Sequence, residues 1–251
     1  MGKLDGKVAI VTGGAKGLGR AYCLGLAKEG AGVVMAAHRF DTEAAKQAAS
    51  EIESKGGLAL EVDVTSEEST KLMAEETVKK YGRIDILVNN AAMYRGISRK
   101  GILEIPVDEW DRLMTVNLKG MFLCCRAVIP QMMKQQKGKI INMTSEVAFT
   151  GSRGMIHYVT SKGGVIGFTR SLAAELGAHN ICVNAIAPGF TDSPASRAMI
   201  DDISKYDVSR TPLRRLEQPG DLVGAVLFFA GDESDFITGQ TLVVDGGRYM
   251  H

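Results

Sequence analysis

The sequence lacks an excess of charge of either sign. Its 251 residues include 30 Lys and Arg against 29 Asp and Glu, which gives a formal net charge of +1 at pH 7. No run of basic residues interleaved with aromatic ones is present. Binding to nucleic acids or acidic membranes depends on such a surplus of positive charge, so we expect neither partner.

Marks of secretion, membrane insertion and metal binding are scarce as well. The four cysteines, Cys23, Cys124, Cys125 and Cys182, form no Cys-x-x-Cys motif, and the four histidines are not clustered. We therefore predict no metal site and free, buried thiols in a reducing cytoplasm. A polar stretch of six residues opens the chain, and no apolar run reaches about 18 residues, so we expect neither a signal peptide nor a membrane span.

Apolar stretches and helical periodicity alternate along the whole chain. We predict strands at residues 8–12, 33–36, 58–62, 86–89, 139–142, 181–187 and 240–244. Helices are expected at 18–29, 42–54, 66–81, 108–133 (with a bend at Pro130), 156–178 and 221–231. Such alternation predicts one α/β domain over residues 1–251, of the Rossmann-type doubly wound class, with a seven-stranded parallel sheet and helices on both faces. The polar stretch 188–219 is long for a connection, so we expect a substrate loop at about 190–215.

A glycine-rich turn follows the first predicted strand. Residues 12–19 read Thr-Gly-Gly-Ala-Lys-Gly-Leu-Gly, so that Gly13, Gly17 and Gly19 stand at Gly-x-x-x-Gly-x-Gly spacing, with Lys16 and Leu18 between them. Glycines allow a diphosphate to approach backbone N–H groups at the start of a helix. The spacing differs from the general Gly-x-Gly-x-x-Gly fingerprint, but the strand–turn–helix setting predicts dinucleotide binding.

The end of the second predicted strand bears on the choice of dinucleotide. An acidic residue there would hold the ribose hydroxyls of NAD(H), whereas His38 and Arg39 follow the strand in this sequence. Together with Lys16, these residues favour the 2′-phosphate of NADP(H), while NAD(H) stays possible. The alternative is that Lys16 and Arg39 are solvated surface charges.

Tyr158 and Lys162 are four residues apart, so they share one face of a predicted helix. A cation about 6 Å from a phenol favours the phenolate by about 3 kcal/mol, which lowers the pKa of the phenol by about two. A tyrosine with this pKa can exchange a proton with an alcohol oxygen. Ser145 lies thirteen residues upstream. The alternative for Tyr158 and Lys162 alone is a surface pair without function.

Taken together, these motifs resemble the short-chain dehydrogenase/reductase family over nearly the whole chain. The matching landmarks are residues 12–19, Asp63-Val64, residues 89–92, Asn117, Ser145, Tyr158-x-x-x-Lys162, Pro188-Gly189 and the closing residues 239–247. Two departures are Ala92, where glycine is usual, and Ser193, where threonine is commoner.

The resemblance implies a role for each matching residue. Asp63 and Val64 would contact the adenine, and Asn90 and Ala91 would line the ribose. Ser145 would hold the substrate oxygen, Tyr158 would be the acid/base, and Lys162 would bind the nicotinamide ribose and lower the pKa of the tyrosine. Asn117 would anchor a water in a proton relay through Lys162. The remaining cofactor contacts, to the carboxamide, would come from Pro188, Gly189, Thr191 and Ser193.

The resemblance also implies the reaction, a reversible hydride transfer between nicotinamide and a carbon that bears oxygen. We expect the pocket to be walled by Met93, Tyr94, Glu146, Val147, Phe149 and residues 190–212, which are mostly apolar. This favours a medium-sized secondary alcohol or ketone, and residues 161–171 and 236–241 resemble relatives that act on cyclic or aromatic alcohols.

Two alternatives stay open. One is a 3-oxoacyl-[acyl-carrier-protein] reductase, although relatives of that kind place basic residues where Gln136 and His179 stand here. The other is a nucleotide-binding regulator without activity. By the same resemblance, we expect a homotetramer.

Overall fold

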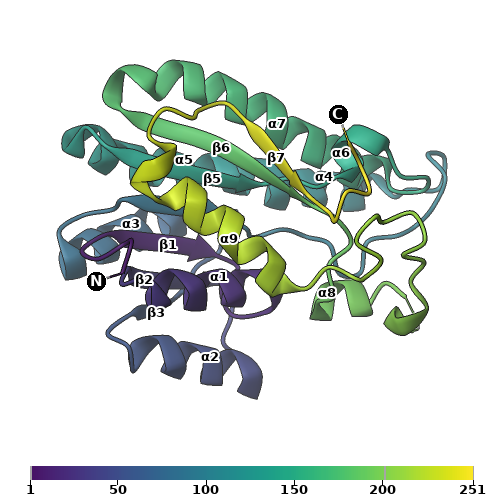
Figure 1. The fold of residues 1–251 in the computed structure, drawn as a ribbon, viewed down its shortest axis with the longest axis horizontal. Helices are drawn as coiled ribbons and strands as arrows, with labels where there is room; N and C mark the ends of the chain where they lie inside the picture. The colour runs from purple at the N-terminus through teal and green to yellow at the C-terminus, as the bar shows by residue number, and fades with distance from the viewer. Residues whose placement is uncertain (1, 201, 251) are drawn as a thin grey trace.

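A seven-stranded parallel sheet forms the centre of the computed structural model, which describes residues 2–200 and 202–250. The strands are β1 (Val8–Thr12), β2 (Gly32–Ala37), β3 (Leu58–Glu61), β4 (Ile86–Asn89), β5 (Gly138–Met143), β6 (Ile181–Pro188) and β7 (Thr241–Val244). Their order is β3-β2-β1-β4-β5-β6-β7 (Figure 1). The predicted fold class is therefore confirmed. The order reverses between β1 and β4, and a cleft for ligands opens at such a switch point.

Helices cover both faces of the sheet, and each layer buries one apolar cluster. On one face lie α1 (Gly17–Lys28), α2 (Glu43–Glu53) and α9 (Pro219–Ala230), packed on side chains such as Val11, Met35 and Ile186. On the other face lie α3 (Glu67–Tyr81), α5 (Gly120–Gln135) and α7 (Ile156–Leu176), packed on Ile10, Leu87 and Val183 (Figure 1). Alternate residues of a strand point to opposite faces of the sheet. Because helices cover both faces, the residues on both sides of these parallel strands are apolar.

The predicted helix 108–133 is interrupted, but at a different place. α4 (Val107–Met114) continues through a π-helical turn (Thr115–Lys119) into α5, which runs on through Pro130. A π turn widens the helix locally, and such turns often occur at functional sites. Here the turn carries Asn117, which is buried.

By length and composition, the continuous helix Val107–Gln135 could cross a membrane, contrary to the expectation of no such segment. However, 44% of its apolar window is buried inside the domain, and the helix packs on α3, β4 and β5. Its apolar residues are thus explained as those of a core helix.

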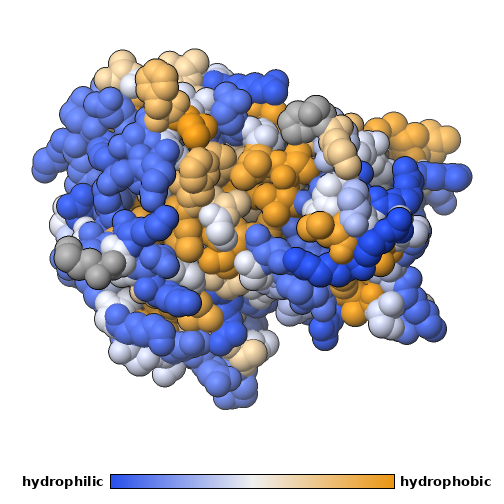
Figure 2. All heavy atoms as spheres, in the orientation of Figure 1, coloured by the Kyte–Doolittle hydropathy of each residue, from blue (hydrophilic) through white to orange (hydrophobic). Residues whose placement is uncertain are grey.

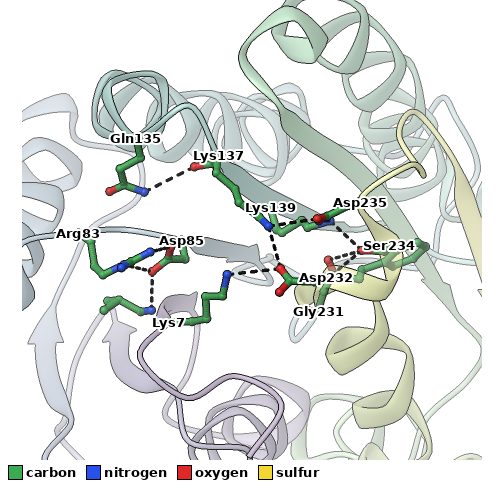
Figure 3. Close-up of polar contacts among 12 residues, drawn as sticks. Lys7, Arg83, Asp85, Gln135, Lys137, Lys139, Gly231, Asp232, Ser234 and Asp235 are labelled. Carbon is green, nitrogen blue, oxygen red and sulfur yellow. Dashed lines mark hydrogen bonds and ion pairs between the residues drawn. The ribbon is translucent and has the colours of Figure 1, made fainter.

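The amino ends of the strands are joined by charged side chains (Figure 3). Asp85 is buried, and its carboxylate accepts hydrogen bonds from the Val8 backbone N–H at 2.8 Å and from Arg83 at 2.6 and 2.7 Å. Lys139 is buried too, with its Nζ 2.8 Å from Asp235 and 3.0 Å from the Ser234 hydroxyl. These contacts hold together the amino ends of the strands, at the end of the sheet opposite the predicted site.

Several short helices lie outside the predicted elements. They are α6 (Val147–Thr150), α8 (Pro194–Arg197) and 3₁₀ turns at Ile203–Lys205 and Asp232–Ser234, while the end of the predicted helix 156–178 is a further 3₁₀ turn, Gly177–His179. Two of them, α8 and Ile203–Lys205, lie inside the polar stretch 188–219, so this stretch is partly ordered by local hydrogen bonds. The four cysteines are free and buried, as predicted.

Candidate active site

A cavity of about 580 Å³ opens at the carboxyl ends of the strands. It brings together thirteen of the predicted site residues: Gly13, Lys16, Gly17, Leu18, Gly19, Asn90, Ala91, Ser145, Tyr158, Lys162, Pro188, Gly189 and Thr191. The other predicted site residues, His38, Arg39, Asp63, Val64, Asn117 and Ser193, do not line it. The cavity therefore joins the phosphate-binding turn to the proposed catalytic residues, while the predicted adenosine contacts lie outside it.

The glycine turn fits a bound diphosphate. Gly17 has a φ of +54°, and a Cβ atom at Gly19 would lie 2.2 Å from the Gly13 carbonyl oxygen, so both positions require glycine. Among the described residues, no side chain caps the start of α1, since Lys16 at its N-cap makes no such bond. Uncapped N–H groups at a helix N-terminus attract anions. The backbone is thus suited to hold a dinucleotide.

The Thr12 hydroxyl fixes the switch point, and the sequence analysis missed it. It accepts hydrogen bonds from the backbone N–H groups of Asn90 and Ala91, both at 3.0 Å, and donates to the Val88 carbonyl at 3.3 Å. The Asn90 amide donates to the Thr12 carbonyl at 2.8 Å. Asn90 and Ala91 are thereby held against the glycine turn. A hydroxyl residue between the first strand and the turn was the available signal.

The predicted adenosine contacts surround the end of β2. His38 and Arg39 are exposed there. The Asp63 carboxylate accepts from the hydroxyl and backbone N–H of Thr65, which lower its pKa, with a smaller contribution from His38. Strand register places Glu61 opposite Ala37, where its carboxylate accepts from the Phe40 N–H at 3.2 Å. An acid therefore does stand near the end of β2, supplied by the neighbouring strand.

Tyr158 and Lys162 meet at the floor of the cavity. Both side chains are buried, and the Lys162 Nζ lies 5.7 Å from the centroid of the Tyr158 ring. Ser145 follows β5 and is also buried. Burial raises the pKa of the Tyr158 phenol, Tyr94 raises it further, and the Ser145 hydroxyl lowers it. Burial lowers the pKa of Lys162 to about 8.

The predicted direction of the pKa of Tyr158 was therefore wrong for the cofactor-free protein. Removing the phenol from water disfavours its anion, and burial is the largest influence on the pKa of Tyr158 in this structure. The ammonium of Lys162 is itself disfavoured by burial, and it donates to the Met143 carbonyl at 2.8 Å. Tyr158 is consequently a protonated acid at neutral pH in this structure.

Asn117 links the residues after β4 to α7 through hydrogen bonds. Its side-chain oxygen accepts from the Met93 N–H at 2.7 Å, and its amide donates to the Ser161 hydroxyl at 3.0 Å. That hydroxyl in turn donates to the Tyr158 carbonyl at 2.8 Å. Asn117 thus fixes Met93 and the first turns of α7, whereas the predicted water relay through Lys162 stays a prediction.

The predicted carboxamide contacts are already hydrogen-bonded within the protein. The Thr191 hydroxyl donates to the Glu217 carboxylate at 2.6 Å, and the Ser193 hydroxyl caps α8 by accepting from the Ser196 N–H. Burial raises the pKa of Glu217 to about 7. One of its oxygens, Oε1, is buried without a partner among the described residues. Glu217 was missed because nothing in its sequence surroundings indicates burial.

The predicted substrate walls are partly confirmed. Tyr94, Glu146, Val147 and Phe190 line the cavity, whereas Met93 and Phe149 do not. The ring centroids of Tyr94 and Tyr158 lie 5.0 Å apart. An aromatic ring therefore lies beside the Tyr158 phenol, in keeping with a substrate that has an apolar part.

The fold is a Rossmann-type α/β fold, in which one cavity joins the glycine turn to Ser145, Tyr158 and Lys162. Residues 13–249 match a family model described as Enoyl-(Acyl carrier protein) reductase. The chain is 40% identical to the 3-oxoacyl-[acyl-carrier-protein] reductase FabG of Staphylococcus aureus, an alignment that covers 97% of this chain and 98% of the relative. It is 41% identical to FabG of Thermotoga maritima and 44% identical to an uncharacterized oxidoreductase of Mycobacterium tuberculosis. Each of these two alignments covers 98% of this chain and 98% of the relative.

The chain belongs to the short-chain dehydrogenase/reductase family, which confirms the resemblance found in the sequence.

Proposed function

We propose that the protein reduces the 3-oxo group of an acyl thioester with NADPH. Two of the relatives reported above carry the name of a 3-oxoacyl-[acyl-carrier-protein] reductase. The observation that carries the reaction class is the convergence of Ser145, Tyr158 and the glycine turn on one cavity. This proposal replaces the free alcohol or ketone that the sequence favoured.

The geometry suits reduction. When bound, the nicotinamide supplies the hydride that adds to the carbonyl carbon. The raised pKa keeps the Tyr158 phenol protonated, so Tyr158 can donate its proton to the oxygen as negative charge develops there. The Ser145 hydroxyl donates a hydrogen bond to the same oxygen, worth about 2–4 kcal/mol in the transition state. Lys162 would contact the ribose, and its ammonium would favour the phenolate that forms.

For the cofactor, we propose a preference for NADP(H). Lys16, His38 and Arg39 are exposed near the glycine turn and the end of β2, where a 2′-phosphate would lie. Glu61 opposes this preference, because its carboxylate could accept a ribose hydroxyl instead. The comparison of kcat/KM for NADPH and NADH, in the wild type and in Arg39→Asp, tests this. The variant should lose most of its preference, and an unchanged ratio would overturn the assignment.

A second candidate is a free secondary alcohol or ketone. Gln136 ends α5 and lies 3.2 Å from the His179 Nδ1 beyond the end of α7, so neither supplies a permanent cation at the places expected for carrier docking. The aromatic walls suit a ring-bearing substrate equally well. A nucleotide-binding regulator is the least supported reading, because the chain keeps the tyrosine and the lysine.

The test is a substrate panel followed at the nicotinamide absorbance. Acetoacetyl thioesters of acyl-carrier protein and of coenzyme A are compared with cyclohexanone and acetophenone, each with NADPH and NADH. The thioesters should give the higher kcat/KM. Faster turnover of the free ketones would favour the second candidate, and no absorbance change with any substrate would overturn both.

We also propose a homotetramer in the cytoplasm. Three large apolar residues are exposed here: Phe228 on α9 at 41%, Phe236 in the connection before β7 at 104%, and Leu242 on β7 at 40%. Figure 2 shows apolar side chains gathered near the centre of this face, over β7 and α9. An apolar surface of this kind favours a subunit interface. Light scattering coupled to size exclusion should give four times the chain mass.

A further inference from the structure

Three arginines from distant parts of the chain reach the mouth of the cavity. Arg99 lies in the connection between β4 and α4, Arg210 in the predicted substrate loop, and Arg248 after β7. All three line the same cavity as Ser145 and Tyr158. The cluster exists only in the folded chain, and the sequence analysis did not find it.

These arginines have no salt-bridge partner among the described residues. Over residues 2–200 and 202–250, none of the three forms an ion pair, whereas Arg197 and Arg215 of the same polar stretch each pair with an aspartate at 2.6 Å. Unpaired guanidinium groups in a cavity are available to an anionic ligand.

Few acidic side chains line the cavity. Glu146 is the one acidic residue among the described residues that line it. Burial raises the pKa of Glu146, Arg248 lowers it and Asp245 raises it. Among the residues that line the cavity, these three guanidinium groups therefore face one carboxyl that burial inclines toward its neutral form. The exposed Asp207 carboxylate, whose pKa Arg248 and Arg210 help to lower, lies outside the lining.

The Arg248 side chain is held in place by its surroundings, and the backbone next to Arg99 is anchored. The Arg248 guanidinium donates to the Asp207 carbonyl at 3.2 Å and lies 5.5 Å from the centroid of the Tyr206 ring, which stacks on Phe190 at 4.3 Å. Ser98, next to Arg99, donates both its N–H and its hydroxyl to the Glu109 carboxylate. Fixed side chains lose less entropy when a ligand binds.

The positive charge extends toward the catalytic phenol. Burial raises the pKa of Tyr206, while Arg248 and Arg99 lower it, so both arginines act on one ring. Burial raises the pKa of Tyr94 and Arg99 lowers it. Since the ring of Tyr94 lies 5.0 Å from that of Tyr158, the charge of Arg99 acts on a ring that packs against this phenol.

Building on the proposed reduction, we propose that the substrate carries an anionic group, a carboxylate or a phosphate, which Arg99, Arg210 and Arg248 bind at the cavity mouth. The carbonyl of the same molecule lies at Ser145 and Tyr158. Guanidinium groups bind both kinds of anion through paired hydrogen bonds. A free 3-oxo acid would offer its carboxylate, and a thioester of coenzyme A or of a carrier arm would offer phosphate.

Four substrates with one reacting group test the proposal. Ethyl acetoacetate and the acetoacetyl thioester of N-acetylcysteamine are neutral, whereas acetoacetate and acetoacetyl coenzyme A are anionic. Acetoacetate is compared with its ethyl ester, and acetoacetyl coenzyme A with the N-acetylcysteamine thioester. In at least one pair the anionic substrate should have a kcat/KM about tenfold higher than the neutral one, and this ratio should fall as salt is added. A gain confined to acetoacetate indicates the carboxylate, and a gain confined to the coenzyme A thioester indicates the phosphate.

The variants Arg99→Gln, Arg210→Gln and Arg248→Gln identify the binding residues. Each should lower kcat/KM for the preferred anionic substrate by about tenfold to a hundredfold, through KM, and change that of its neutral counterpart less than twofold. The control is Lys205→Gln, which removes an exposed charge from the same loop and should leave all four substrates unchanged. Equal losses on neutral and anionic substrates, or no preference in the wild type, would overturn the proposal.

The anion site can also be tested if the proposed reduction itself is not observed. If no substrate is turned over, the binding of acetoacetate and of inorganic pyrophosphate to the NADP⁺-loaded protein is measured by calorimetry. Binding that the arginine variants weaken supports the anion site on its own. Binding that they leave unchanged, or no binding of either anion, overturns it.

Discussion

Replacing Lys162 with methionine should stabilise the cofactor-free protein while removing its activity. Burial lowers the pKa of Lys162 from 10.5 to about 8, so folding disfavours the charged form. By linkage, that difference corresponds to about 3 kcal/mol of lost stability at pH 7. Methionine has nearly the same length and no charge. It loses the hydrogen bond to the Met143 carbonyl, worth about 1 kcal/mol, which leaves a net gain of about 2 kcal/mol.

The gain should depend on pH in a defined direction. Because the folded pKa of Lys162 lies below the unfolded value, the destabilisation is fully present below about pH 8 and disappears as the pH rises through 10.5. At pH 9.5 it has fallen to about 1.4 kcal/mol by the same relation. Wild type and Lys162→Met should therefore be about equally stable there.

The difference in the free energy of unfolding between wild type and Lys162→Met is measured at pH 7 and at pH 9.5. The method is urea unfolding followed by circular dichroism, at fixed protein concentration and without nucleotide. The matched control is Lys139→Met, a second buried lysine whose ammonium contacts Asp235 and Ser234. Removing a paired ammonium should destabilise the protein by about 1–3 kcal/mol at both pH values. If Lys162→Met is destabilised at pH 7 as Lys139→Met is, the ammonium of Lys162 is well solvated or paired, and the reasoning fails.

Three further substitutions test the supporting structure. Asn117→Ala removes the hydrogen bonds to Met93 and Ser161, so the melting temperature should fall. In steady-state kinetics, kcat should fall by a larger factor than KM changes. A rise in KM with kcat unchanged would contradict the positioning role. Glu217→Gln should be more stable than wild type by about 3 kcal/mol at pH 8 and by only about 1 kcal/mol at pH 5, because the folded pKa of about 7 lies above the unfolded 4.5. Thermal unfolding at both pH values checks this, and a gain that does not change with pH would contradict it. Asp85→Ala should lower the free energy of unfolding by about 2–4 kcal/mol, since a buried backbone N–H and Arg83 lose their acceptor; a loss under 0.5 kcal/mol would refute it.

The elements that sequence predicted well are those with strong local signals. The strands of the parallel sheet are short apolar runs, and glycines mark the turns, so β1, β4 and β6 were found within one residue. The π turn was missed because one extra residue in a helical turn barely alters the apolar periodicity. Pro130 was the visible irregularity, yet α5 continues through it.

The chemistry of the site was less accessible, because it depends on tertiary burial. The spacing of Tyr158 and Lys162 placed them together, but it could not show that burial would raise the pKa of the phenol and lower that of the lysine. Glu61 was overlooked because strand register, not sequence distance, brings it beside β2. Arg99, Arg210 and Arg248 lie more than a hundred residues apart at the extremes, so their convergence required the fold.

The most direct test of the account is the turnover of Tyr158→Phe in a protein that still binds NADPH. Nucleotide affinity is measured by fluorescence titration, and reduction of an acetoacetyl thioester by the loss of nicotinamide absorbance. The account predicts nearly unchanged NADPH affinity with kcat lowered at least about a thousandfold, since the general acid and its hydrogen bond are both lost. Turnover within about tenfold of wild type, with the nucleotide bound, would show that another group protonates the substrate oxygen.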